Sequence, residues 1–145
     1  MMNVLFNPFE DRTDRDVRNF LGNAFICALH KKDQALVDHA VSDLDQKKLP
    51  GPAQSYITSR YERYAAVLDQ MSLNPLLGSD IYATAGLLWD ESLFFECHEW
   101  LEQNYRSVQG QEKKILQAMI RTAGTFELLA YNRKKAAVSV AAKAL

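Results

Sequence analysis

The chain has 145 residues, 48% of them hydrophobic, which is enough for one well-packed core and too few for two large domains. Its 17 Lys and Arg residues nearly balance its 18 Asp and Glu residues, leaving a formal net charge of -1. A chain without a strong overall charge is not drawn to nucleic acid or to an anionic membrane, so we favour neither as a partner. We therefore expect one helical domain over residues 1–145.

The start of the sequence and the two cysteines bear on location. Residues 1–8 lack a charged leader followed by a long apolar run, and no stretch of about 18 apolar residues occurs in the chain. Cys27 and Cys97 stand among apolar or aromatic neighbours and form no Cys-x-x-Cys pair, so both are expected to be reduced thiols in the core. These features predict a cytoplasmic protein.

Apolar residues recur at helical spacing along most of the chain, and no segment shows the alternation of a strand. Pro50 and Pro52 interrupt the path between the second and third helices, and short polar turns elsewhere favour antiparallel neighbours. We expect an all-α fold of about seven helices, packed as antiparallel helical hairpins in a single bundle or a short solenoid-like domain. The expected helices cover residues 13–29, 36–44, 53–71, 80–89, 94–105, 113–130 and 133–144.

The helix expected over residues 94–105 has the most informative pattern. Steps of about 100° per residue place five side chains on one face: Phe94, His98, Leu101, Glu102 and Tyr105. Trp100 falls roughly opposite. Burying an unpaired carboxylate costs several kcal/mol, so Glu102 is expected to have a cationic or hydrogen-bonding partner, a bound ligand or an unusual protonation state.

Residues 94–121 also carry an extended motif. The residues are Phe94-Phe95-Glu96-Cys97-His98-Glu99-Trp100-Leu101-Glu102-Gln103-Asn104-Tyr105, then Gly110, then Leu116-Gln117-Ala118-Met119-Ile120-Arg121. They resemble a known family, the domain of unknown function 309, whose members carry a pattern like Gly-x-Tyr-Phe-Glu-Ala-His-Glu-x-Leu-Glu-x-x-Trp, a glycine, and Leu-Gln-Gly-Leu-Ile-Gln. Ser92 stands where the family usually has a turn glycine, Tyr105 replaces its tryptophan, and Arg121 replaces its second glutamine.

The resemblance implies an all-helical fold and a polar cluster at the His-Glu-x-x-Glu motif. It implies no reaction, because the family is named for its lack of a known function. Residues 80–145 are the part that resembles the family. Residues 1–72 are expected to form an additional N-terminal helical region.

His98, Glu99 and Glu102 are close enough in sequence for their side chains to converge on one side of a helix. The favoured hypothesis is a structural hydrogen-bond network in which His98 satisfies Glu102, while Tyr105 or Gln117 completes the set. Such a network would stabilise a junction between helices and border a small pocket.

An alternative hypothesis gives the same residues a chemical role. With Glu127 from the following helix, His98, Glu99 and Glu102 would supply three or four ligands for a divalent metal. His98 and Glu102 would otherwise serve acid-base catalysis in a hydrolase-like enzyme. No activated nucleophile, phosphate-binding glycine loop or cofactor motif accompanies them, so we assign no catalytic residue, no metal ligand and no cofactor.

The sequence therefore favours a non-enzymatic interaction or small-ligand-binding module over an enzyme. The expected partner is another protein or a second copy of the chain. The alanine-rich face of the last helix is a candidate contact of a homodimer. Trp100, placed opposite the apolar stripe, is expected either to be an interface anchor or to cover another helix.

Overall fold

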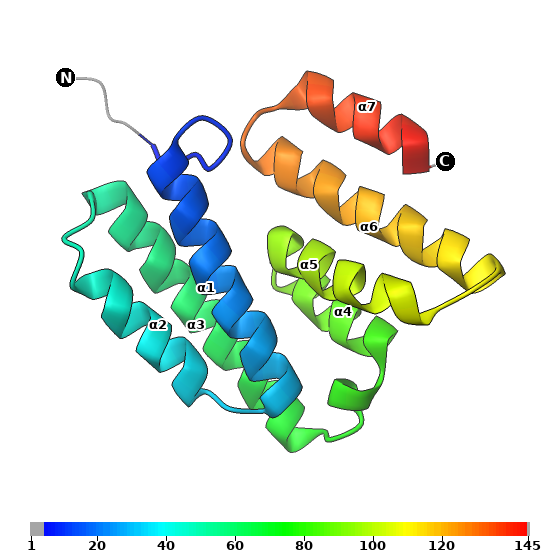
Figure 1. Ribbon diagram of the computed structural model, residues 1–145, viewed down its shortest axis with the longest axis horizontal. Helices are drawn as coiled ribbons and strands as arrows, with labels where there is room; N and C mark the ends of the chain where they lie inside the picture. Colours follow the sequence, from blue (N-terminus) through cyan, green and yellow to red (C-terminus); the bar gives the residue numbers. More distant parts are fainter. Residues whose placement is uncertain (1–4, 145) are drawn as a thin grey trace. The chain divides into compact units, whose positions relative to one another are not determined.

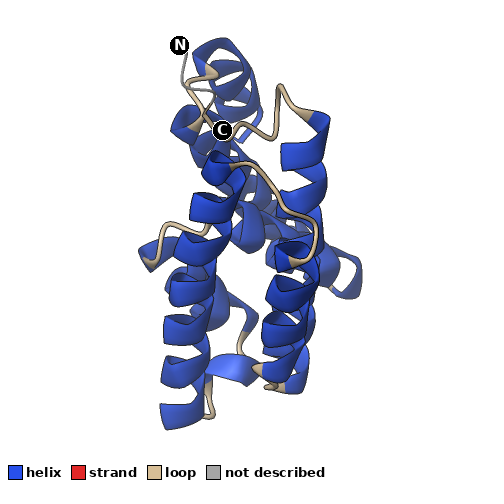
Figure 2. Ribbon diagram, turned by 90° about the vertical axis from the view of Figure 1, so that its left-hand side faces the viewer, coloured by secondary structure: helices blue, strands red, loops and turns tan. Residues whose placement is uncertain are grey.

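The computed structural model describes residues 5–144, which form seven α-helices and two short 3-10 helices and contain no strand (Figure 2). The prediction of an all-α fold with about seven helices is therefore confirmed. The helices fall into two compact units, Met1–Pro75 and Leu76–Leu145. The arrangement as a single domain of antiparallel hairpins stays a prediction.

The first unit contains α1 (Arg12–Lys31), α2 (Ala35–Asp45) and α3 (Gly51–Leu73), each of which contacts the other two (Figure 1). The helical spacing of apolar residues in α1 places one stripe in the core: Val17, Leu21, Phe25, Ala28 and Leu29. Phe25 stacks on Tyr64 of α3 with ring centroids 3.9 Å apart. This aromatic pair joins the first and third helices at the centre of the unit.

The second unit contains α4 (Ile81–Asp90), α5 (Phe94–Asn104), α6 (Gln111–Ala130) and α7 (Lys134–Ala144). The short 3-10 helices Leu77–Ser79 and Tyr105–Ser107 precede α4 and follow α5. α5 packs against both α4 and α6, and α7 packs along α6 (Figure 1). The helix with the motif is therefore enclosed on two sides, and α6 has one neighbour on each of two faces.

Local sequence explains where these helices begin and end. Asp80 caps α4, because its side chain accepts hydrogen bonds from the backbone amides of Tyr82 and Ala83. Ser92 then adopts a left-handed conformation, with φ of 57°, and the amide of Leu93 donates to the carbonyl of Leu88 at 2.9 Å. This bonding closes the end of α4 and turns the chain directly into α5.

Two further observations concern the sequence predictions of location and thiol burial. Cys97 is buried, as predicted, but Cys27 is exposed, so the prediction of a core position for Cys27 is wrong. Cys27 stands among apolar residues in the sequence, but at about 100° per residue its side chain falls on the side of α1 away from the buried stripe. Within residues 5–144, no helix combines the length and the apolar character needed to cross a membrane.

Candidate functional site

The buried face of α5 differs from the predicted one. Glu96 is completely buried, whereas the side chain of Glu102, predicted to face inward, is 55% exposed. The residues of this helix that are buried are Phe95, Glu96, Cys97, Trp100 and Leu101. The prediction of a helix over these residues is therefore right, but the face predicted to be buried is wrong. The side of α5 that packs on α4 carries the large indole of Trp100.

Two hydrogen bonds fix this orientation of α5 against α4. The indole Nε1 of Trp100 donates to the carbonyl of Ile81 at 3.0 Å, and the Cys97 thiol donates to the carbonyl of Ala85 at 3.6 Å. Trp100 is 3% exposed, so of its two predicted roles, an interface anchor or a cover over another helix, the structure supports the second. Its indole covers α4 and satisfies a carbonyl there.

The buried environment also sets the protonation state of Cys97. Burial, and after it the charge of Glu96, raises the pKa of this thiol to about 12. A thiol with that pKa is protonated at neutral pH and is a poor nucleophile. Cys97 is therefore a packing residue.

His98 lies on a partly exposed side of α5 among carboxylates. Its Nδ1 is 3.6 Å from Oε1 of Glu99, and its Nε2 is 3.9 Å from Oε2 of Glu102. Burial lowers the pKa of His98, but the hydrogen bond and charge of Glu99, followed by the charges of Glu102 and Glu127, outweigh it and raise the pKa above the ordinary value of 6.5. The structure thus brings His98, Glu99, Glu102 and Glu127 near one another and favours a positively charged imidazole.

The other predicted members of this cluster have different surroundings. Tyr105 lies at the end of α5 with the ammonium of Lys113 4.6 Å from its ring centroid. Gln117 is half-buried on α6. In the part of the chain that the structure describes, no group of three or more His, Cys, Asp or Glu side chains is arranged to hold a metal ion. A network completed by Tyr105 or Gln117 stays a prediction.

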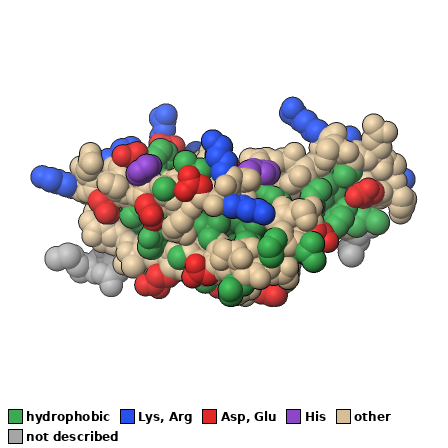
Figure 3. Space-filling model, turned by 90° about the horizontal axis from the view of Figure 1, so that it is seen from below, with side chains coloured by type: hydrophobic (Ala, Val, Ile, Leu, Met, Phe, Trp, Pro, Cys, Tyr) green, Lys and Arg blue, Asp and Glu red, His purple; other side chains and the backbone are tan. Residues whose placement is uncertain are grey.

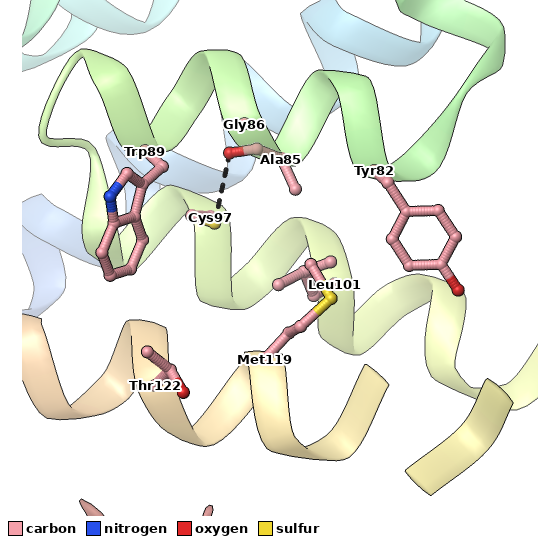
Figure 4. Close-up of a pocket in the computed structure, with 8 residues that line it drawn as sticks. All are labelled: Tyr82, Ala85, Gly86, Trp89, Cys97, Leu101, Met119 and Thr122. Atoms are coloured by element: carbon pink, nitrogen blue, oxygen red, sulfur yellow. Dashed lines mark hydrogen bonds between the residues drawn. The ribbon is translucent and has the colours of Figure 1, made fainter. Parts of the chain in front are cut away.

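A pocket of about 290 Å³ opens between α4, α5 and α6 (Figure 4). Trp89 and Tyr82 stand at its two ends, and Leu101 and Met119 point toward one another at its middle. Its lining residues are Tyr82, Ala85, Gly86 and Trp89 from α4, Cys97 and Leu101 from α5, and Met119 and Thr122 from α6. His98 is not among them, so the pocket is separate from the motif's polar cluster.

The hydroxyl and thiol hydrogens of the residues that line this pocket already have acceptors. The Tyr82 hydroxyl donates to Oε1 of Glu112 at 2.8 Å, and the Thr122 hydroxyl donates to the carbonyl of Ala118 at 2.8 Å. The hydrogen bond to Glu112, then burial and the charges of Glu112 and Asp80, raise the pKa of Tyr82, which keeps the phenol protonated. With the Cys97 thiol bonded to Ala85 as well, the pocket offers mainly apolar surface.

An aromatic cluster continues this apolar surface beyond the pocket. The ring of Trp89 meets those of Phe94 and Phe126 nearly edge-on, with centroids 4.9 Å and 4.8 Å apart. Phe126 is 41% exposed despite these contacts. The apolar area therefore reaches from the pocket to solvent along α6.

The sequence alone did not identify the pocket. Its residues occupy apolar positions at helical spacing, which are typical of an ordinary core. Gly86 was the available signal, because a glycine inside a helix costs about 1 kcal/mol relative to alanine. No atom lies within 4 Å of the point where a Cβ on Gly86 would stand, and this open space belongs to the pocket.

Charged side chains show no concentration of one sign on the face seen in Figure 3. Lys and Arg side chains there are dispersed among acidic and hydrophobic ones. Nucleic-acid recognition ordinarily uses a clustered basic surface. That nucleic acid is not the partner stays a prediction.

The second unit is therefore a small group of helices with a mainly apolar pocket between α4, α5 and α6. Residues 82–140 match the model of a family described as Domain of unknown function (DUF309). The match runs from Tyr82 in α4 to Val140 in α7, and it confirms the predicted resemblance for this part of the chain. No curated protein and no solved structure matches the sequence.

Proposed function

We propose that the second unit is a non-enzymatic binding module and that the pocket between α4, α5 and α6 is its binding site. The observation that carries this proposal is an open apolar pocket whose nearby hydroxyl and thiol hydrogens are already bonded within the protein. A volume of about 290 Å³ lies at the small end of the range for ligand pockets, about 300–1,000 Å³. The site thus suits one small apolar or aromatic group.

The protonation states support binding over catalysis. The pKa of Cys97, the nucleophile type that lines the pocket, is raised to about 12, so its reactive thiolate is scarce. His98 is not among the residues that line the pocket, so its imidazole is not placed to act on a group bound there. The alternative, an acid-base or metal-dependent enzyme that uses His98 and Glu102, is supported less because Glu102 is largely exposed.

In this proposal the His98 cluster has a structural role at the junction of α5 and α6, and the module acts in the cytoplasm through a protein partner or a small ligand. Self-association through the last helix is the homodimer hypothesis. That helix offers one buried alanine, Ala137, to α6 and leaves Val138 69% exposed.

A small aromatic probe tests the binding site. Fluorine NMR of fluorobenzene should show line broadening with the native protein, because exchange into the pocket slows its tumbling. Gly86→Leu should remove the broadening by filling the pocket. Gly51→Leu is the matched control, since a Cβ at Gly51 also meets nothing within 4 Å but lies in α3. Equal broadening with both variants would contradict the proposal.

A further inference from the structure

We draw no further inference here: the strongest candidate, the surface patch on α6 that exposes the apolar side chains of Ile115, Phe126 and Leu129, carries nothing because nothing in the structure shows what covers it.

Discussion

His98 packs directly on α6 at Gly124, with its imidazole Cδ2 3.6 Å from the point that a Cβ on Gly124 would occupy. This is an ordinary van der Waals separation, so the imidazole lies close to the backbone of α6 at this residue. Glu127, one turn further along α6, is thereby close enough for its charge to act on His98. The residue singled out by the motif therefore joins two helices of the second unit.

His98 should make stability depend on pH. Its pKa is raised in the folded state, so folding favours the protonated imidazole. The resulting stability is fully present below the unfolded pKa of about 6.5 and is lost as pH rises through the folded pKa. Urea denaturation at pH 6 and pH 8.5 should therefore show a larger loss in the native protein than in His98→Asn.

The carboxylates around His98 provide a direct check on that pH dependence. NMR titration of the His98 ring should give a pKa above 6.5, which Glu99→Gln should lower because the nearest acceptor loses its charge. A native pKa at or below 6.5 would show that burial, which acts in the opposite direction, is the stronger effect.

Glu96 and Glu102 should differ sharply in their effect on stability. Glu96→Ala removes a fully buried side chain and its interactions, so the free energy of unfolding should fall by about 2–4 kcal/mol. Glu102→Ala removes a side chain that is 55% exposed and should cost less than about 1 kcal/mol. Chemical denaturation of both variants measures the difference. The reverse order would restore the inward face first predicted for α5.

Ser92→Gly should stabilise the turn between α4 and α5. Ser92 has φ of 57°, a left-handed conformation that glycine adopts without steric cost. We expect a gain of about 0.5–1 kcal/mol in thermal or urea unfolding. Ser139→Gly, at an exposed helical position in α7, is the control and should instead lose a similar amount. Loss of stability in both variants would contradict the turn geometry.

The two thiols should react at very different rates. Cys27 is exposed, whereas Cys97 is buried and its pKa is raised to about 12. A disulfide reagent at pH 8 should therefore modify one thiol quickly and the second only after unfolding, and Cys27→Ser should remove the fast phase. A fast phase that survives Cys27→Ser would mean that Cys97 is accessible as a nucleophile.

The positions of the helices were predictable because apolar spacing and turn residues act within each segment of the chain. The helices expected over residues 13–29 and 80–89 correspond to α1 and α4, and the apolar spacing in the first matches the buried residues of α1 except for Phe20, which is 42% exposed. The phase of α5 was not predictable in this way. The apolar residues Phe94 and Tyr105 led us to predict that their side of α5 is buried. The hydrogen bond from Trp100 to Ile81 shows that a different side packs on α4.

The pocket was harder to predict than any helix. Its space results from how three helices pack around Gly86, and a single sequence does not specify the distance between helices. The His98 cluster was found because its residues are neighbours on one helix. Glu127, named in the sequence analysis with this cluster as a possible ligand from the following helix, is buried in α6.

The central claim is that the pocket between α4, α5 and α6 binds an apolar group. The most direct measurement is methyl NMR of the methionine residues during titration with fluorobenzene. We predict that the Met119 methyl signal shifts and saturates, while that of Met71, buried in α3, stays in place. An unchanged Met119 signal at saturating fluorobenzene would contradict the account.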